Sequence, residues 1–389
     1  MNEPKLRFKA DDGSQFPDWE EKKLGDITEK VVRKDANSNA DVRMISQGNG
    51  FILQSNKYSR ENAGQSLKKY TLLKRDEFAY NHGASKVKPY GVCYRLCESD
   101  EARVPYVYHT FKLIDGDSIF WNYSLNTSCM DRQLKKMVSS GARMDGLLNI
   151  GYDAYMSVNI HVPSLPEQQK IAEFLSTIDT VIEKQKETVS AWEERKKGVM
   201  QKLFSQEVRF KADDGSDFPE WEEKKLGDIA DVKVGEKPTL VSDNAAYEYV
   251  NAGTTNSGYV DSYNCDGDTV TTPSRGQGGI GYVGYQKHEF WLGPLCYKIK
   301  SNKDDVLTKF MYYALSFDSK KIVDLKKVGT IPAINRADLI ELYMNFPCLA
   351  EQQKIADCLS SFDEVIEKQK ATLAAWEELK KGLLQQMFV

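Results

Sequence analysis

The sequence has 389 residues, of which 41% are apolar and 28% are charged, enough for two or three ordinary globular domains. Its formal net charge is −4, its apolar runs are too short for a membrane span, and its N-terminus lacks the apolar middle of a signal peptide, so we expect a cytoplasmic protein. Seven scattered cysteines fit reduced thiols better than a disulfide framework or a zinc site.

Charge is unevenly distributed along the chain. Residues 30–163 contain 19 Lys and Arg against 13 Asp and Glu, whereas residues 232–348 contain 13 of each kind. Residues 207–231 are acidic, with 4 basic and 9 acidic side chains. The first of these regions can therefore carry a local basic surface that faces phosphate groups, despite the negative total charge.

A segment near the N-terminus occurs twice, and we call it the box. Residues 6–27, LRFKADDGSQFPDWEEKKLGDI, return almost unchanged as VRFKADDGSDFPEWEEKKLGDI at 208–229. Its Asp-Gly pair predicts a turn, and Trp19 and Trp221 precede an amphipathic run. Two nearly identical boxes cannot read two different ligands. We therefore expect both tryptophans to pack on the spacer formed by the two long helices of residues 167–204 and 351–388, rather than to stack on bases.

A variable region follows each box. Residues 70–96 and 263–285 alternate apolar and polar side chains around turn residues, which predicts a hairpin in each region. Each region then ends in a glycine-led loop and a short apolar strand, over 141–163 and 329–347. The two regions predict one mixed α and β lobe made twice, with different surfaces.

Two loops in each variable region have the residue types that read base edges in the major groove of DNA. Arg, Lys, Asn and Gln hydrogen bond to base edges, Ser and Thr add contacts, and small residues allow close approach. The alternative for any single residue is that Gly, Asn and Ser only make turns. The predicted DNA-binding residues are Gln47, Asn49, Asn81, His82, Ser85, Lys86 and Lys88 in the first region, and Asn251, Thr254, Thr255, Asn256, Ser274, Arg275 and Gln277 in the second.

A long helix follows each variable region. The segments 167–204 and 351–388 both begin with EQQKIA and place apolar residues at alternating steps of four and three, which is the seam of a two-helix coiled coil. A single helix would expose this apolar stripe to water, so we expect the two helices to pack antiparallel against each other as a spacer. The principal seam residues are Ile171, Leu175, Ile178, Ile182, Gln185 and Trp192, and Ile355, Leu359, Phe362, Ile366, Gln369 and Trp376.

Polar residues interrupt the seam at matching places. Gln185 and Gln369, with Lys196 and Lys380, weaken apolar packing but can fix the register of the two helices. At the start of the first helix, Ser164 and Glu167 have the spacing of a capping box. The predicted organisation is a box and lobe over 1–164, a helix over 165–205, a second box and lobe over 206–348, and a second helix over 349–389.

The motifs of common enzymes are missing from the sequence. The glycine-rich segment 276–281 lacks the Lys-Ser/Thr of a P-loop and sits between strand-like runs rather than before a helix. The sequence also lacks the Asn-Pro-Pro-aromatic motif of amino-methyltransferases, and its four histidines stand far apart. We therefore expect a protein without a catalytic centre or a bound metal.

The duplicated order of box, variable region and EQQKIA helix resembles the specificity (S) subunit of type I restriction-modification systems. The resemblance covers essentially the whole chain. It rests on the two EQQKIA helices, the W-x-x-x-x-L-G-D-I pattern of each box, and the glycine-led loop before each helix.

This resemblance implies an α+β fold in which two similar target recognition domains are separated by two long helices, packed as an antiparallel coiled coil with a pseudo-two-fold internal repeat. It implies a non-catalytic subunit whose lobes each read one half of a bipartite, asymmetric site in double-stranded DNA. The helices would set the gap between the half-sites and dock two modification (methyltransferase) subunits, which two restriction subunits can join. S-adenosylmethionine, ATP and magnesium would be bound by those partners, so the chain itself would hold no cofactor, and no membrane is involved.

Two other functions stay open at this point. One is an orphan S-like protein that binds DNA or sequesters modification subunits without serving an active complex. The other is a coiled-coil scaffold whose lobes bind proteins or glycans.

Overall fold

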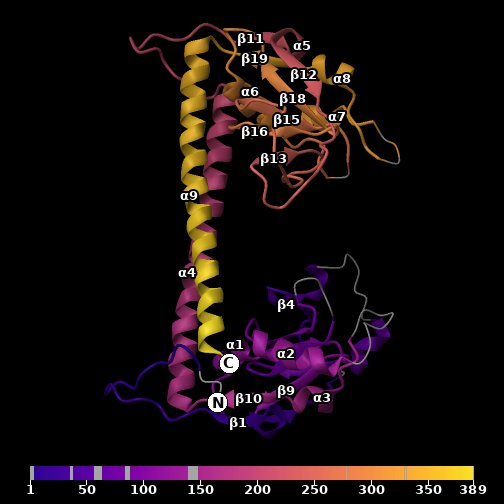
Figure 1. Ribbon diagram of the computed structural model, residues 1–389, viewed down its shortest axis with the longest axis vertical. Coiled ribbons are helices and arrows are strands. Elements are labelled where there is room, and N and C mark those ends of the chain that lie inside the picture. The colour runs from indigo at the N-terminus through magenta and orange to yellow at the C-terminus, as the bar shows by residue number, and fades with distance from the viewer. Residues whose placement is uncertain are drawn as a thin grey trace. The chain divides into compact units, whose positions relative to one another are not determined.

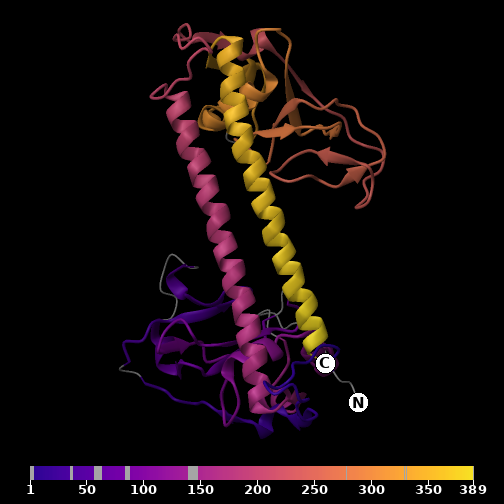
Figure 2. The ribbon, with the colours of Figure 1, turned by 90° about the vertical axis from the view of Figure 1, so that its left-hand side faces the viewer.

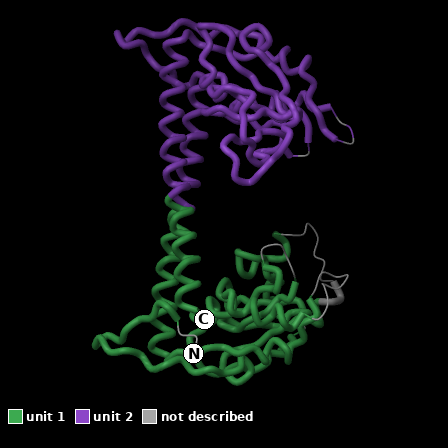
Figure 3. Tube along the Cα trace, in the orientation of Figure 1, with its two compact units in different colours: residues 1–185, 372–389 green, residues 186–371 purple. Residues whose placement is uncertain are grey.

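The chain folds into two compact units. The computed structural model describes residues 4–35, 38–56, 64–83, 88–138, 148–276, 278–327, 329 and 331–388. Unit 1 comprises residues 1–185 and 372–389, and unit 2 comprises residues 186–371 (Figure 3). Each unit contains one box, one sheet-rich lobe and one part of each of the two long helices.

The lobe of unit 1 is built on a four-stranded antiparallel sheet in the order β2-β9-β6-β7. Buried aromatic side chains, among them Phe78, Phe111 and Trp121, fill its core. The elements before the first long helix are β1 (Glu20–Lys23), η1 (Leu24–Asp26), β2 (Thr28–Lys30), β3 (Arg43–Ser46), β4 (Gly50–Leu53), η2 (Gln54–Asn56), η3 (Gly64–Lys69), β5 (Thr71–Lys74), β6 (Phe78–Asn81), β7 (Val92–Arg95), β8 (Glu101–Val104), β9 (His109–Leu113), α1 (Ser118–Ser124), α2 (Ser128–Met137), α3 (Tyr152–Met156) and β10 (Asn159–Val162) (Figure 1).

The lobe of unit 2 repeats this plan with different side chains. Its main sheet has the order β12-β18-β15-β16 and is also antiparallel, while β13 pairs with β14 and with β17 in a separate small sheet. The elements are β11 (Glu222–Lys225), α5 (Leu226–Ile229), β12 (Ala230–Val234), β13 (Tyr247–Val250), β14 (Tyr259–Val260), β15 (Thr269–Pro273), β16 (Gly284–Gln286), β17 (Trp291–Leu292), β18 (Cys296–Ser301), α6 (Thr308–Phe317), α7 (Ser319–Asp324), α8 (Arg336–Ile340) and β19 (Tyr343–Phe346).

Both predicted hairpins are present. β6 and β7 pair antiparallel within residues 70–96, and β15 and β16 pair antiparallel over Thr269–Gln286, one residue beyond the predicted segment 263–285. The strand that closes each lobe, β10 or β19, pairs with the strand of its own box, β1 or β11. Each box is therefore part of its lobe. The two tryptophans contact the long helices as expected, since Trp19 donates to Glu167 and Trp221 to Glu351, and they pack on the lobes as well. Trp19 lies edge-on to Phe120 at 6.1 Å, and Trp221 to Phe310 at 5.9 Å.

The two predicted helices are α4 (Leu165–Phe204) and α9 (Leu349–Met387), which run alongside each other (Figures 1 and 2). In unit 2, Trp192 of α4 lies 6.1 Å from Phe362 of α9 between ring centroids, and Lys370 pairs with Glu193. In unit 1, Lys380 near the end of α9 pairs with Asp179 in the first part of α4. The helices are thus antiparallel, and the predicted α+β class with two lobes and two packed helices is confirmed.

The apolar stripe of each helix serves its lobe as well as its partner helix. Ile171, Leu175 and Ile178 are buried in one cluster with Phe120 and Trp121 of the unit 1 lobe. In unit 2, Ile355 and Leu359 are buried with residues of α6 in the same way. The expectation that the other helix alone would cover the seam was therefore incomplete, because each helix start is also a wall of a lobe core.

The capping box predicted for α4 does not form. The Ser164 hydroxyl is buried without a hydrogen-bond partner among the described residues, and the Glu167 carboxylate bonds elsewhere. A separate backbone contact connects the N-terminal segment to the end of α9, where Leu6 N donates to Gln386 O at 3.1 Å. The equivalent atoms in the second repeat, Val208 N and Lys202 O, lie 3.2 Å apart.

Candidate nucleic-acid interface

A buried carboxylate at the start of each long helix holds the box. Glu167 is fully buried, and its two oxygens accept hydrogen bonds from Arg7 Nε at 3.0 Å and Arg7 Nη2 at 2.8 Å. Trp19 Nε1 donates to the same carboxylate at 3.1 Å. In the second repeat Glu351 accepts from Arg209 and Trp221 with matching geometry. A bidentate arginine pair with a third donor satisfies a buried charge.

The next residue of each helix holds the lobe. The Gln168 amide nitrogen donates to Pro163 O at 2.9 Å, and its oxygen accepts from Asp117 N at 3.0 Å. Gln352 does the same in unit 2, donating to Pro347 O at 2.9 Å and accepting from Leu307 N at 2.9 Å. The first two polar residues of EQQKIA therefore fix box, lobe and helix to one another.

A three-residue polar junction forms once in each unit. In unit 1, Lys380 of α9 pairs with Asp179 of α4, and Tyr123 of the lobe donates to the same carboxylate at 2.6 Å. Burial and the neighbouring carboxylate raise the pKa of Tyr123, so the hydroxyl stays protonated as a donor. In unit 2 the same roles are taken by Lys196, Asp363 and Tyr313. The lysines that interrupt the apolar seam thus make ion pairs between the helices.

The first predicted loop of unit 1 is a tight turn at the tip of a hairpin. Residues 47–49 connect β3 to β4, and Asn49 is exposed while Gln47 is half-buried. The turn is hydrogen bonded to β7 of the lobe, because Gly48 N donates to the Tyr94 hydroxyl at 3.0 Å. The turn therefore presents Asn49 to solvent on a fixed backbone.

The second predicted loop of unit 1 begins with residues that are used inside the protein. The two ring nitrogens of His82 face backbone carbonyls, Leu148 O at 2.9 Å and Val107 O at 3.0 Å. The Asn81 oxygen accepts from Gly83 N at 3.0 Å, and Lys88 Nζ donates to Asn126 O at 3.0 Å. We therefore assign His82 a structural role. Ser85 and Lys86 lie outside the described residues.

The two predicted loops of unit 2 touch each other. Gly279 of the β15–β16 loop packs against the backbone of Gly253, where a Cβ atom at position 279 would lie 3.0 Å from Gly253 N, a tight contact. Asn251 and Ser274 support this junction, since the Asn251 oxygen accepts from Leu295 N at 2.9 Å and Ser274 is buried. The exposed members of the predicted set are Thr254, Thr255, Asn256 and Arg275, while Gln277 lies outside the described residues.

Arg275 is presented on a fixed backbone. It forms an antiparallel bridge with Ala333, and the next residue, Gly276, donates its N–H to Pro332 O at 3.1 Å. Its side chain is exposed and makes no salt bridge with any residue that the structure describes. An exposed arginine on a rigid loop is the arrangement that allows a bidentate contact with a guanine edge.

The contacts that hold each box to its helix were not predicted from the sequence. Arg7 and Glu167 are 160 positions apart, and Arg209 and Glu351 are 142 apart. A signal was nevertheless present, because an arginine in each box and a glutamate at each helix start recur in the same relative order. No group of three or more His, Cys, Asp and Glu in the described part of the chain is arranged to hold a metal ion. None of its helices combines the length and apolarity needed to cross a membrane.

Comparisons with known proteins agree on one family. The family model described as the type I restriction modification DNA specificity domain matches residues 133–190 and 219–375. A putative type I specificity subunit of Mycoplasma pneumoniae is 30% identical over 155 residues, which cover 38% of this chain and 42% of that protein. The MjaX specificity subunit of Methanocaldococcus jannaschii, a putative type I restriction enzyme subunit, is 28% identical over 246 residues, or 58% of this chain and 57% of that protein. The matches thus span about half the length of these relatives.

The fold has a close counterpart among solved structures. The crystal structure of a type I restriction-modification S subunit from M. genitalium aligns with a TM-score of 0.63 and covers 100% of this chain and 99% of that chain. The sequence identity is 17%, so this likeness concerns the fold.

Proposed function

Since this chain belongs to the type I restriction modification DNA specificity family, we propose that it is the DNA-recognition subunit of a type I restriction-modification complex. Each lobe reads one half of a bipartite, asymmetric site in double-stranded DNA. The observation that carries this proposal is the repeat itself: two sheets with one strand order bear two unlike sets of loops. A repeated frame with unlike loops suits two different half-sites.

The base-reading residues of this proposal are the exposed ones. Asn49 in unit 1, and Thr254, Thr255, Asn256 and Arg275 in unit 2, are available for base edges. The backbones of the loops that carry Asn49 and Arg275 are hydrogen bonded to the lobe. Asn81, His82 and Asn251, which are half-buried, and Ser274, which is buried, position these loops instead.

The partners of this proposal follow from the repeat as well. Two similar helix starts offer two similar surfaces, which suits two identical modification subunits. Those subunits would bind S-adenosylmethionine and methylate adenines, and two restriction subunits with ATP and magnesium can join them. The chain itself performs no catalysis in this proposal and works in the cytoplasm.

The test is to express the chain with its modification subunit in a host that lacks adenine methylation, and to map methylated adenines in that host's DNA. The expected result is one motif of two unlike half-sites with a gap of constant length. The control is the modification subunit alone, which should leave the DNA unmodified. A complex that assembles but methylates no site would favour the orphan alternative, in which the chain sequesters its partners.

A further inference from the structure

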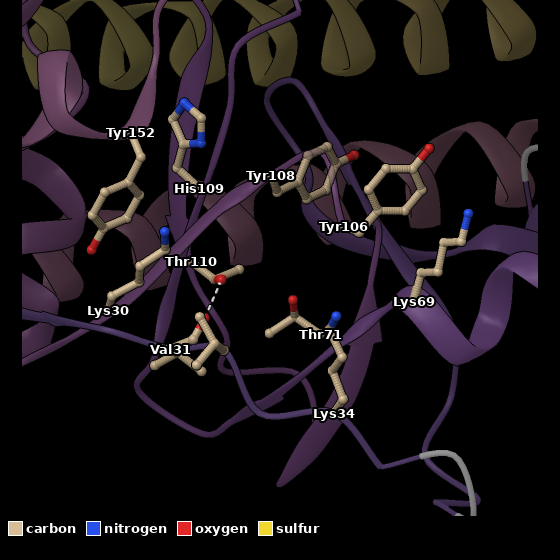
Figure 4. A pocket seen from close by; sticks show the side chains of 11 residues that line it. Lys30, Val31, Lys34, Lys69, Thr71, Tyr106, Tyr108, His109, Thr110 and Tyr152 are labelled. Atoms are coloured by element: carbon tan, nitrogen blue, oxygen red, sulfur yellow. Dashed lines mark hydrogen bonds between the residues drawn. The ribbon is translucent and has the colours of Figure 1, made fainter.

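A pocket in the lobe of unit 1 combines lysines with tyrosines. Its volume is about 460 Å³, and β2, β9 and the chain segments next to them form its walls (Figure 4). Figure 4 shows Lys30 beside Tyr152 and Lys69 beside Tyr106, while Lys34 stands apart from the rings. The six side chains concerned are Lys30, Lys34 and Lys69, and Tyr106, Tyr108 and Tyr152.

The floor of this lysine–tyrosine pocket is fixed by the fold. Val31 N donates to Thr110 O at 3.0 Å, and the Thr110 hydroxyl donates to Val31 O at 2.7 Å. Leu72 N donates to Arg33 O at 2.8 Å, which ties β5 to the same segment. The pocket is thus already formed before a ligand arrives, which reduces the entropy lost on binding.

The charge in the pocket is uncompensated. Its lining contains no Asp or Glu, and the three lysines make no salt bridge within the part of the chain that the structure describes. Lys30 Nζ lies 4.4 Å from the Tyr152 ring centre, and Lys69 Nζ lies 6.0 Å from that of Tyr106. By contrast, Lys112 on β9 is paired with Glu29 at 3.0 Å. Three unpaired ammonium groups around a hollow favour an anion.

Two side chains of the pocket lining contact the segments that lead to the predicted base-reading loops of unit 1. The Tyr108 hydroxyl accepts from Ile45 N at 3.3 Å, and Ile45 belongs to the strand that leads to Asn49. His109 in the pocket wall lies 4.9 Å from His82 between ring centroids, at the start of the second loop. Burial lowers the pKa of His109, so at neutral pH the positive charge of the pocket comes from its lysines.

We propose that this pocket binds a phosphate group of the DNA backbone beside the half-site read by unit 1, an inference that rests on the proposed function. The ammonium groups supply the opposing charge, and the Tyr106 and Thr71 hydroxyls at the pocket supply neutral donors. Such contacts carry no sequence information, but they fix the register of the protein on the duplex and raise its affinity for all sequences. A free nucleoside monophosphate presents the same chemistry, and the experiment separates the two sources.

This anchor belongs to one lobe only. The boxes are offset by 202 residues, so Val232 and Glu236 stand in unit 2 where Lys30 and Lys34 stand in unit 1. Val232 is buried, and Glu236 has the opposite charge to Lys34. We therefore expect the pocket to account for part of the charge difference between the two lobes.

The test compares two triple variants of the chain in its complex with the modification subunits. The pocket variant is Lys30→Gln, Lys34→Gln and Lys69→Gln, and the control variant is Lys5→Gln, Lys22→Gln and Lys112→Gln, which removes the same charge from unit 1 outside the pocket. Binding to target and non-target duplexes is measured over a range of salt concentrations. Ethylation interference then locates the phosphates that matter, and a titration with AMP tests the free nucleotide.

The expected result is that the pocket variant still assembles and keeps its methylation motif, but loses affinity for both duplexes. Each lost phosphate contact should lower the salt slope by about 0.9 and the affinity about 5-fold at about 150 mM salt. Interference should vanish at phosphates beside the unit 1 half-site, and the control should behave as wild type. The proposal is overturned if both variants bind alike, if the pocket variant loses its partner subunits, or if AMP binds the pocket while DNA binding is unchanged. If the wild-type complex binds no DNA, it is the proposed function that fails.

Discussion

Single residues decide how each lobe is attached to its helix. Glu167 and Glu351 are fully buried, yet each is the acceptor of three hydrogen bonds from an arginine and a tryptophan of its box. A buried carboxylate is stable only while those donors remain, because the charge has no water to replace them. The arginine–glutamate pair therefore joins the box to the helix, and changing one carboxylate oxygen should destabilise this junction.

Glu167→Gln should destabilise unit 1 by about 3 kcal/mol, the lower end of the range for breaking a buried pair, because Gln keeps one acceptor but removes the buried negative charge that opposes Arg7. Urea unfolding of the full chain measures this change. The matched control is Asp18→Asn, which removes an exposed carboxylate 3.9 Å from the same guanidinium and should cost less than about 1 kcal/mol. Equal effects of the two substitutions would contradict the assignment.

Arg275→Ala should relax one position of one half-site and leave the other half-site unchanged. A bidentate arginine contact discriminates against the wrong base by about 1–3 kcal/mol, and the loop that carries Arg275 is fixed by its bridge to Ala333. Mapping of methylated adenines with the variant complex measures this change. The control is Lys233→Ala, which removes an exposed charge on β12 whose salt bridge to Asp231, at 3.7 Å, is itself exposed. An unaltered motif in the Arg275 variant would exclude its contact with a base.

At the scale of single residues, local sequence patterns predicted which positions carry functional polar side chains better than they predicted the hydrogen-bond partners of those side chains. Ser164 and Glu167 have the spacing of a capping box, but the carboxylate finds Arg7, which no local window can reveal. The loop residues show the same limit, because Asn, Ser and His suit base contacts and turns equally well. Only the fold separates His82, whose ring nitrogens face backbone carbonyls, from Asn49, which is exposed.

Whole elements were predictable where the pattern was long. The seam of α4 and α9 repeats over many turns, so the existence, length and pairing of both helices followed from the sequence. The role of Lys196 and Lys380 did not, because their acceptors, Asp363 and Asp179, sit beside the seam on the other helix. The additional cover of each helix start by a lobe core also depends on contacts distant in sequence.

Removing one heptad from each helix should shorten the gap between the half-sites. The deletion takes out 184–190 and 369–375, which face each other because Asp179 pairs with Lys380 and Lys196 with Asp363. Seven residues are about 10 Å of helix and nearly two whole turns, so the remaining seam stays in phase. We expect a gap shorter by about 3 base pairs, at 3.4 Å for each step of a strand. The deletion of one helix segment alone should prevent folding, and an unaltered gap would refute the role of the helices as a ruler.

At the scale of the whole molecule, average properties are poor guides to the partner. The net charge of −4 conceals a basic first variable region and a neutral second one. Part of this basic charge lies in the lysine–tyrosine pocket, on Lys30, Lys34 and Lys69. No short sequence motif contains all three lysines. The duplicated order of segments predicted the repeat of the fold. The difference between the lobes, a basic pocket in unit 1, became visible only from the side chains in the structure.

The hydrogen bond from Leu6 N to Gln386 O brings the N-terminal segment next to the end of the C-terminal helix, so residues near the two ends of the chain lie close together. The equivalent bond from Val208 N to Lys202 O spans a continuous stretch of chain, so both repeats have the same junction and only one is covalently joined. Linking residue 388 to residue 4 through a short Gly-Ser peptide, and opening the chain between residues 205 and 207, should therefore yield a circular permutant that folds and methylates the same motif. Melting temperature and motif mapping compare it with the parent, and a permutant that cannot fold would mean that the two junctions are not interchangeable.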